Sequence, residues 1–382
     1  MKFDTKKIYW PVTLFILINI VAALILTPIY LYYAGFSWGL WLFALVFAAA
    51  TNLSITAGYH RLFSHKSYDA HPFVKWIYLL IGASAWQGSA LKWSSDHRRH
   101  HTHIDSEKDP YNIERGFWFA HMGWMFLKET VDQPIHAPDL VKDSAVKLQD
   151  KYFIPLGIFM GYIVPGIIGA LFFDSFWGGF IIAGSLRIAL TQQSTFFVNS
   201  LCHTLGKQTY SKDISARDSF IVAVLTHGEG YHNFHHTFQI DYRNGIKWYH
   251  WDPTKWVIQT LAFFSLAHKL KTIPQVEIIR AKLQADEQRL ISKGLFDEKL
   301  VTIRTRILEA QAKMKTLKEE YKTLKEEYQM RHQEFQSAYG TKWANMKRDL
   351  ELKLLEMHKE MEKTQLEFRV GMKQWKLYLK SI

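Results

Sequence analysis

Hydrophobic residues fill the chain from Ile8 to His60, where 53 consecutive positions hold no Asp, Glu, Lys or Arg. A membrane-spanning helix needs about 20 apolar residues, so this stretch is long enough for two spans and a short turn. We place the spans near residues 9–33 and 38–59. Because unpaired backbone groups are costly in hydrocarbon, both segments are expected to be helices.

A second apolar block runs from Tyr152 to Leu205 and contains only two charged residues, Asp174 and Arg187. It predicts two more spans, near residues 152–173 and 177–201. Arg187 lies inside the last of these spans, as a paired structural charge or as a support for a site below it. The N-terminal run is too long for the core of a typical signal peptide, so we interpret it as an anchor.

The basic residues give these spans an orientation. Lys and Arg are absent from the turns at 34–37 and 174–176, and are frequent in the N-terminus, in residues 61–151 and after residue 206. Basic stretches next to spans stay in the cytoplasm. The sequence therefore predicts an all-α, multi-pass membrane protein with four transmembrane helices, a cytoplasmic helical cap and both termini in the cytoplasm.

Composition divides the chain into two regions. Residues 1–274 carry 24 Lys and Arg and 18 Asp and Glu, whereas the much shorter stretch 275–382 carries 23 and 17. The chain is 48% hydrophobic and holds one cysteine, Cys202, which excludes a disordered chain and a disulfide-stapled fold. We expect a membrane domain over residues 1–272 and a charged helical tail over 273–382.

Apolar residues in the tail recur with heptad spacing from Leu300 to Tyr328 and again from Trp343 to Met361, with Gly340 between the two runs. Two helices folding back at Gly340 would form an antiparallel, coiled-coil-like hairpin. A continuous rod that self-associates is the alternative, and a solvated helical appendage without a specific partner is a third interpretation.

Half of the 18 histidines fall in four short groups: His60 and His65; His97, His100 and His101; His203; and His232, His235 and His236. Helix positions i, i+3 and i+4 share a face, so each His-x-x-His-His run presents three imidazoles in one direction. Every group follows a predicted membrane exit on the cytoplasmic side. Nine neutral nitrogen ligands fit a two-metal redox centre better than a zinc hydrolase site, and imidazole suits Fe, Zn, Cu and Ni alike.

Motifs around these histidines extend beyond the histidines themselves. They include Trp86-Gln87-Gly88, Asp96-His97-Arg98, Asp109-Pro110-Tyr111, Asn199-Ser200-Leu201-Cys202-His203 and Gly228-Glu229-Gly230-Tyr231-His232-Asn233. From about residue 10 to 272 the sequence resembles the integral-membrane fatty acid desaturases, specifically the acyl-CoA (stearoyl-CoA Δ9) desaturase group, in a bacterial type without a cytochrome b5 domain. Histidine boxes alone would leave alkane hydroxylases and carotenoid ketolases open.

The resemblance implies an O2-dependent oxidoreductase with two non-haem iron ions and O2 as co-substrate. One iron would be bound by His60, His101, His203 and His236, with Asn199 reaching it through water. The other would be bound by His65, His97, His100, His232 and His235. Four carboxylates are expected either to orient imidazoles by accepting their other N–H or to act as structural caps: Asp96, Asp105, Asp109 and Glu229.

The resemblance also implies a saturated long-chain fatty acyl substrate in an apolar tunnel, with Trp86 and Trp93 in its walls, and a cis double bond near mid-chain. Acyl-CoA members commonly carry an arginine two residues before the second box, where this chain has Ser95. Phosphate groups are held by Arg or Lys, so we expect compensation by Lys92, Arg98, Arg99 and Lys128. Acyl-lipid and acyl-carrier substrates stay open.

The expected partners follow from the same resemblance. No His-Pro-Gly-Gly haem signature occurs in the sequence, so electrons are expected from a separate ferredoxin, cytochrome b5-like protein or reductase. Membrane lipid is a further expected partner, and nucleic acid is not. The compact N-terminus favours a bacterial cytoplasmic membrane over the endoplasmic reticulum. Two other functions stay open: a membrane di-iron fatty acid or alkane hydroxylase, and a non-catalytic membrane scaffold that displays the coiled coil.

Overall fold

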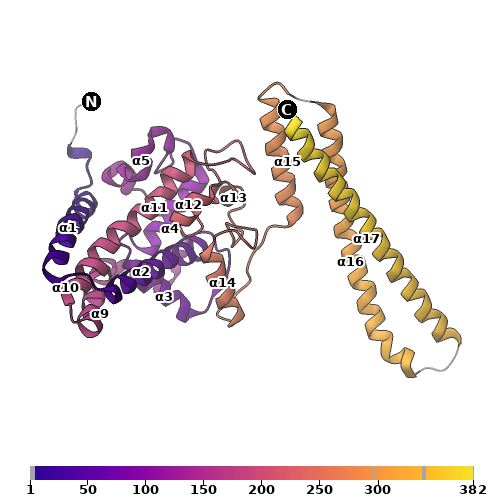
Figure 1. Cartoon of the computed structure of the whole chain (residues 1–382), viewed down its shortest axis with the longest axis horizontal. Helices are drawn as coiled ribbons and strands as arrows, with labels where there is room; N and C mark the ends of the chain where they lie inside the picture. The colour runs from indigo at the N-terminus through magenta and orange to yellow at the C-terminus, as the bar shows by residue number, and fades with distance from the viewer. Residues whose placement is uncertain (1–4, 296, 338–340, 382) are drawn as a thin grey trace. The chain divides into compact units, whose positions relative to one another are not determined.

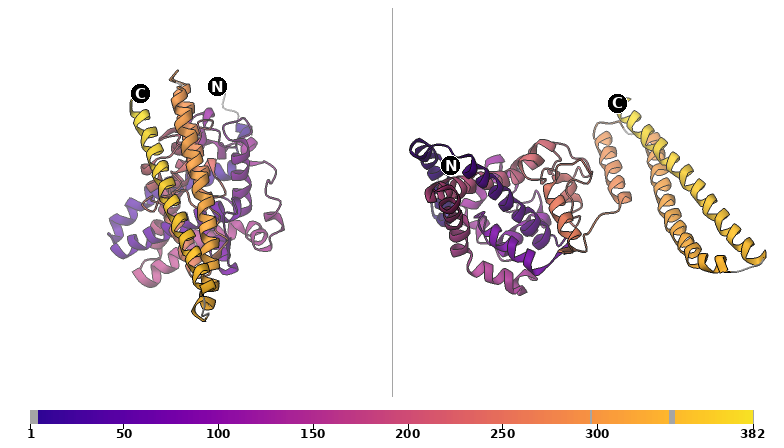
Figure 2. Two further views of the ribbon diagram at one scale, coloured as in Figure 1. Left: turned by 90° about the vertical axis from the view of Figure 1, so that its right-hand side faces the viewer. Right: turned by 60° about the horizontal axis from the view of Figure 1, so that its bottom comes forward.

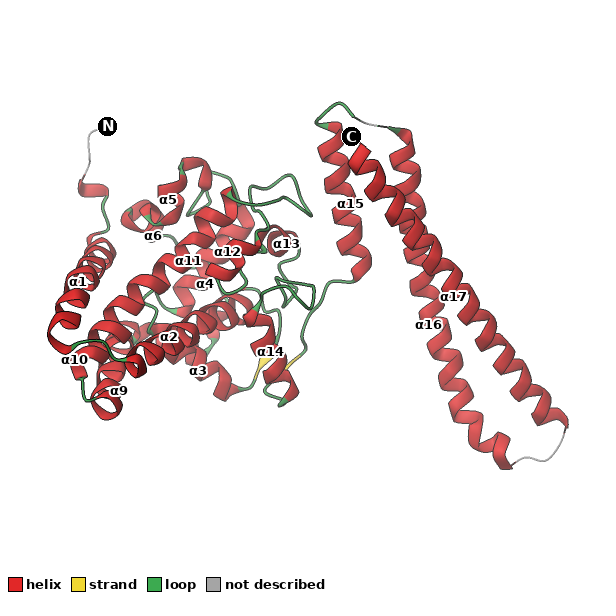
Figure 3. Ribbon diagram, in the orientation of Figure 1, coloured by secondary structure: helices red, strands yellow, loops and turns green. Residues whose placement is uncertain are grey.

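The computed structural model describes residues 5–295, 297–337 and 341–381, which are mostly helical (Figure 3). The chain forms two compact units, Met1–Ile273 and Pro274–Ile382. The first unit contains the long apolar stretches and all four histidine groups, and the second contains the charged, heptad-patterned region.

Within the described residues, three continuous helices are long and apolar enough to cross a membrane: Trp10–Ala34, Trp38–Ser64 and Phe153–Phe173. The first is α1 (Trp10–Ala34); the second is α2 (Trp38–Leu53) continued by a π-helical stretch, η2 (Ser54–Ser64); the third comprises α8 (Phe153–Ile158), η6 (Phe159–Ile163) and α9 (Val164–Phe173). On α1, Ile18 is 63% and Leu24 69% exposed, as expected for side chains that face lipid.

The expected fourth span is also one unbroken helix, made of α10 (Phe176–Gly178), η7 (Gly179–Leu186) and α11 (Arg187–Thr204). It does not belong to the three apolar helices above, because Arg187, Gln192 and Gln193 lower its hydropathy. The second span is longer than expected, because the helix continues through His60 to Ser64.

Arg187 is buried without a carboxylate partner among the residues that the structure describes. Its guanidinium donates hydrogen bonds to the carbonyl oxygens of Ala183, Ser84 and Gly161 and to the hydroxyl of Thr51. Carbonyl groups of two helices and of the loop after α3, together with the Thr51 hydroxyl of a third helix, thus solvate the charge in place of a paired carboxylate, and Arg187 ties these elements together.

The rest of the first unit consists of short elements. They are η1 (Thr5–Lys7), α3 (Pro72–Ala83), α4 (Ala90–His103), η3 (Ile113–Arg115), α5 (Phe117–His121), η4 (Gly123–Phe126), α6 (Lys128–Val131), η5 (Leu140–Lys142), α7 (Ser144–Lys151), α12 (Phe220–Leu225), α13 (His232–Thr237) and α14 (Pro253–Phe263). Two-residue strands β1 (Asp69–Ala70) and β2 (Ala267–His268) pair antiparallel.

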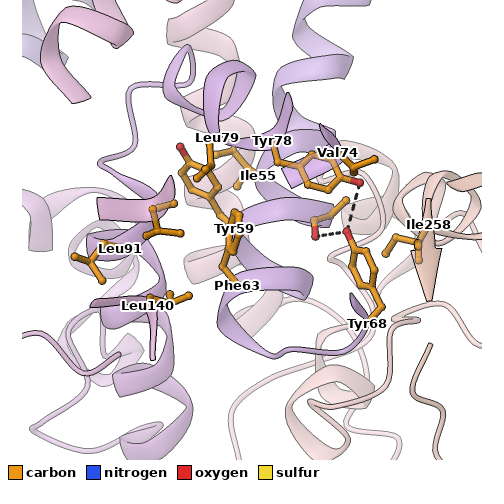
Figure 4. Packing of buried hydrophobic residues seen from close by; sticks show 14 of the residues in the cluster. Ile55, Tyr59, Phe63, Tyr68, Val74, Tyr78, Leu79, Leu91, Leu140 and Ile258 are labelled. Carbon is orange, nitrogen blue, oxygen red and sulfur yellow. Dashed lines mark hydrogen bonds between the residues drawn. The ribbon is translucent and has the colours of Figure 1, made fainter. Parts of the chain in front are cut away.

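A buried apolar cluster holds η2 in place (Figure 4). Tyr59 and Phe63 of η2 lie in it with Tyr78 and Leu79 of α3, and all four side chains are at most 5% exposed. Tyr68 donates a hydrogen bond of 2.9 Å to the carbonyl oxygen of Ala57. Because His60 follows Tyr59 directly, this packing fixes the helix that carries the first histidine.

The second unit contains α15 (Gln275–Ile291), α16 (Glu298–Ser337) and α17 (Thr341–Ser381). Helices α16 and α17 lie side by side (Figures 1 and 2). Tyr328 bonds to Glu351 and Lys313 to Glu360, which gives the pair an antiparallel register. The core of the unit is apolar: Leu283, Leu290, Leu300, Ile307 and Trp375. The seam that a self-associating rod would offer to a second copy is therefore filled within the chain.

Candidate metal centre

Four helical segments bring the nine histidines together. His60 lies in η2 and His65 directly follows it; His97, His100 and His101 lie on α4; His203 lies in the last turn of α11; and His232, His235 and His236 lie on α13. Six of the nine side chains are buried and the other three are half-buried. No two of these segments are neighbours in sequence, so their convergence is a property of the fold.

Among the described residues, the histidines form two groups: His60, His65, His97, His101 and His235 in the first, and His100, His203, His232 and His236 in the second. The ligand nitrogens of each group lie within 4.8 Å of one another. This corrects the partition that the resemblance implied. Positions i and i+4 of each His-x-x-His-His run stay together, whereas His100 and His235, at i+3, each join the group formed mainly by the other run.

The ring nitrogens face one another closely enough to suit bound cations. Nε2 of His235 lies 2.9 Å from Nε2 of His60 and 3.0 Å from Nε2 of His101. One nitrogen cannot satisfy two such neighbours by donating a single proton, and the buried Nε2 of His203 has no hydrogen-bond partner in the described part of the chain. Lone pairs directed at shared metal ions explain both observations, so the donor set fits two metals.

Burial keeps these imidazoles in the form that binds metal. It lowers the pKa of His97, His101 and His235 well below the usual value, and neighbouring histidines lower it further. The rings are therefore neutral at physiological pH, with a lone pair free for a cation.

Two of the four expected carboxylates contact a histidine directly. Glu229 lies 3.0 Å from Nδ1 of His60, and Asp109 lies 2.9 Å from Nδ1 of His100. Each carboxylate accepts the Nδ1–H and so directs Nε2 toward the centre of its group. The expectation that these two residues orient imidazoles therefore agrees with the geometry.

Asp105 is linked to His203 through Ser215. The hydroxyl of Ser215 lies 2.6 Å from Nδ1 of His203 and donates to the carboxylate of Asp105, which also accepts the backbone N–H of Ser215. Ser215 had not been predicted from the sequence, since it lies in the loop after α11 with no motif around it.

The contacts of Asp96 do not match the first of its two expected roles, orienting an imidazole. Its carboxylate pairs with Lys92, one turn earlier on α4, at 2.6 Å, and Nδ1 of His97 lies instead 3.3 Å from the hydroxyl of Tyr111. The i, i+4 spacing of Lys92 and Asp96 is the sequence signal for this pairing. Burial raises the pKa of Tyr111 well above its usual value, so the phenol stays protonated beside the imidazole.

Arg61, which the sequence did not predict as a site residue, holds Glu229 in place. It is 1% exposed and donates hydrogen bonds to Glu229 and to both carboxylate oxygens of Asp252. The side-chain amide of Asn244 also donates to Glu229, at 2.7 Å. Burial alone would raise the pKa of Glu229, but His60 and Arg61 lower it to about 2, so the carboxylate stays ionised.

A cavity of about 90 Å³ adjoins both histidine groups. Asn199, one turn before His203 on α11, lines it, and Trp93 lines it too, as expected. Gln87 joins Trp93 to Thr195 across the cavity lining. Its side-chain N–H donates to the hydroxyl of Thr195 at 2.9 Å, and its side-chain oxygen accepts from the indole N–H of Trp93 at 3.3 Å. The apolar lining consists of Ile55, Trp93, Trp124, Met125, Phe196 and Val198.

Trp86 does not line this cavity. Its ring stacks on Phe15 at 4.4 Å and its N–H donates to the carbonyl oxygen of Gly157. Gly157 and Gly161 contact this ring where larger residues would clash, since a Cβ at Gly161 would lie 2.8 Å from Nε1. The side chain therefore packs helices together, and the expectation that it lines an acyl tunnel stays a prediction.

The four cations expected to hold phosphate groups differ in whether they already pair with a carboxylate. Lys92 is paired with Asp96, and Arg98 is held by Asp139 and by the backbone carbonyls of Phe63 and Ser64. Arg99 bonds only to the neutral groups of Gln133 and Pro134, and Lys128 is exposed. Arg99 and Lys128 are the members of this set without a carboxylate partner among the described residues.

The fold and the site define a class of protein. A model of the fatty acid desaturase family matches residues 36–268, and the chain belongs to that family, as the histidine motifs predicted. The matched region ends within the first unit, so α15, α16 and α17 lie outside it.

Individual relatives carry more specific names. The chain is 41% identical to acyl-CoA desaturase 1 of Saccharomyces cerevisiae over 254 residues, which cover 66% of this chain and 50% of that protein. It is 41% identical to a probable acyl-CoA desaturase of Schizosaccharomyces pombe over 251 residues, 65% of this chain and 52% of that protein. It is 34% identical to human stearoyl-CoA desaturase 5 over 251 residues, 64% of this chain and 76% of that protein. The chain thus spans about half the length of the two yeast relatives.

Proposed function

We propose that the protein is an O2-dependent acyl-CoA desaturase, which introduces a cis double bond, at the Δ9 position, into a saturated fatty acyl chain. The observation that carries the proposal is the convergence of nine imidazoles into two groups beside an apolar cavity. The names of the relatives, acyl-CoA and stearoyl-CoA desaturases, support the substrate class.

Two iron ions, one in each histidine group, would supply the oxidant that removes two hydrogens from unactivated methylenes. The acyl chain loses two electrons and two protons, an electron donor adds two electrons, two further protons are taken up, and O2 leaves as two waters. The chain's own residues do the rest. Glu229, Asp109 and the Ser215–Asp105 pair orient imidazoles, and Asn199 reaches the second group through water.

Substrate positioning is proposed to rest on the cavity walls. Trp93 and Phe196 offer apolar surface to the acyl chain, and the Gln87–Thr195 hydrogen bond fixes one wall against the other. Excluding water from this pocket protects the oxidant from side reactions. Arg99 and Lys128, which lack a carboxylate partner among the described residues, are proposed to attract the CoA phosphates in place of the arginine that Ser95 replaces.

The proposal extends to topology and partners. The three long apolar helices and the less apolar helix made of α10, η7 and α11 span the membrane, with the tail and the histidine centre in the cytoplasm, in either a bacterial cytoplasmic membrane or the endoplasmic reticulum. A separate ferredoxin, cytochrome b5-like protein or reductase delivers the electrons. We do not extend the proposal to self-association through the tail, because α16 and α17 pack their apolar seams against each other.

The test is expression in a desaturase-deficient host, followed by mass spectrometry of fatty acid methyl esters with double bonds located by dimethyl disulfide addition. New cis-Δ9 monoenes are expected, and their formation in isolated membranes should require stearoyl-CoA, O2 and reductant. A hydroxylated chain as the main product would assign the protein to the hydroxylases instead. No lipid change from an inserted, iron-loaded protein would overturn the proposal.

A further inference from the structure

Helix α17 carries a second apolar face that lies away from α15 and α16 in the part of the tail that the structure describes. Leu350, Gly371 and Trp375 belong to the buried seam with α16 and α15. Five aliphatic side chains on α17 are instead 45–61% exposed: Leu352, Leu355, Leu366, Val370 and Leu377. At 3.6 residues per turn, these five lie on the side of the helix opposite the seam.

The same side of the helix carries cations between the aliphatic residues. They are all exposed: Arg348, Lys359, Lys363, Lys373 and Lys380. None of the five forms a salt bridge with a carboxylate that the structure describes. Near the edges of this side, Glu362 lies about 60° from its centre in the same direction as Lys380, and Glu356 lies about 60° from it in the other direction. We call the five aliphatic and the five cationic residues together the leucine-lysine face.

The adjacent helix offers a comparison within the same unit. Among the described side chains of α16, Met330 alone is a large hydrophobic residue with high exposure. The solvent side of α16 is also laced by i, i+4 ion pairs, Lys315–Glu319 and Lys322–Glu326. That pattern is typical of a solvated helix. The leucine-lysine face therefore does not follow from the requirements of a soluble hairpin.

The charge of the face selects its partner. A second copy packed on it would bring like charges together around Lys359 and Lys373 and remove them from water, which opposes association. A lipid surface of negative charge accepts both components, because the aliphatic side chains enter the acyl boundary while the lysine stems extend to the headgroups. The first unit of the chain carries helices that suit a bilayer, so a membrane is available to α17 at high effective concentration.

We propose that the leucine-lysine face of α17 docks on an anionic lipid surface, so that the tail is a membrane-binding element sensitive to lipid charge. This role is independent of the reaction at the histidine centre and goes beyond it. It places the charged tail on the membrane under one lipid composition and releases it under another.

The test uses the full-length protein in nanodiscs of phosphatidylcholine alone or of phosphatidylcholine with phosphatidylglycerol. The variant Leu366→Cys is labelled with an environment-sensitive NBD fluorophore, and Lys322→Cys on α16 is the matched control. Wild-type protein treated in parallel measures any labelling of Cys202, which is buried. Emission wavelength and quenching by brominated acyl chains report contact of the probe with lipid.

The expected result is a blue shift and bromolipid quenching at position 366 in anionic discs, their loss in neutral discs, and neither effect at position 322. Adding Lys359→Glu, Lys363→Glu and Lys373→Glu should abolish the shift. Adding Lys318→Glu, Lys322→Glu and Lys325→Glu on α16, the same change in charge, should leave it.

Equal emission at position 366 in both kinds of disc would overturn the proposal. So would a shift that survives charge reversal on α17. A shift in detergent that grows with protein concentration would assign the face to a second copy of the chain. Desaturase activity plays no part in this readout, so the result stands apart from the proposed function.

Discussion

The two units of the chain place their polar residues in opposite ways. The first unit buries Arg61, Arg187 and six of the nine clustered histidines, whereas the central cluster of the tail is apolar and, of its described charged residues, Glu287 alone is buried. Burying polar groups is costly unless each finds a partner. In the network from Arg61 through Glu229 to His60 each side chain has a hydrogen-bond partner, with Nε of Arg61 the one atom left without a partner among the described residues, and the network keeps an imidazole in position. The contrast indicates that the first unit accepts the cost of buried polar groups in order to hold its imidazoles together.

The largest difference between the two units is expected when one histidine is replaced in each. Replacing His97 with Ala should reduce desaturation to background and lower the iron content, because a buried ligand of the first group is lost. Replacing His358 of the tail, whose side chain is 57% exposed, should change neither. Fatty acid profiling and metal analysis of both purified variants check this. An active, fully loaded His97→Ala variant would show that the cluster is not the reactive centre.

Breaking a buried ion pair should have the next largest effect, on stability. Arg61→Met leaves Glu229 and Asp252 buried without their shared cation, and losing one partner of a buried pair costs about 3–5 kcal/mol. Lys313→Met, which removes an exposed pair with Glu360, should leave the unfolding midpoint unchanged. Thermal unfolding in detergent measures both. Equal midpoints for wild type and Arg61→Met would contradict the view that this network holds the site together.

A smaller effect is expected from the hydroxyl beside His203. Ser215→Ala should weaken metal binding about 10- to 100-fold, because Nδ1 of His203 loses its link to Asp105. Ser215→Thr keeps the hydroxyl and should restore binding, and Ser292→Ala in the tail is the control for loss of a hydroxyl. Titration with a metal-competing chelator measures the affinity. Failure of Thr to rescue binding would assign Ser215 a structural role only.

The smallest effect on the reaction is expected from deleting the tail. A chain ending at Thr272 keeps the first unit and all nine histidines, so its activity in detergent should match that of the full chain. The assay is conversion of stearoyl-CoA with a supplied electron donor. Loss of fold on truncation would mean that the two units depend on each other.

Spacing was sufficient to identify six of the nine histidines, because a His-x-x-His-His run shares a helix face whatever the helix packs against. His60, His65 and His203 were identified by their places after predicted membrane spans and by the family resemblance. The partition between the two groups could not be read from the sequence. It depends on which side of α4 meets α13, and in this fold His100 points to the group of His232 and His236. That information is tertiary.

The residues that contact the site also divide into those with a local sequence signal and those that only the fold brings together. The pairing of Lys92 with Asp96 is local and could have been predicted from its i, i+4 spacing. The contact of Ser215 with His203 is made by a loop and has no local signature. The buried Arg187 is solvated by carbonyl groups from two helices and the loop after α3 and by the hydroxyl of Thr51, an arrangement that hydropathy cannot reveal.

Anomalous diffraction at the iron edge from crystals of the iron-loaded protein tests the central claim most directly. The account predicts two iron peaks per chain. One should lie among His60, His65, His97, His101 and His235, and the other among His100, His203, His232 and His236. A single peak, or iron bound away from these side chains, would contradict it.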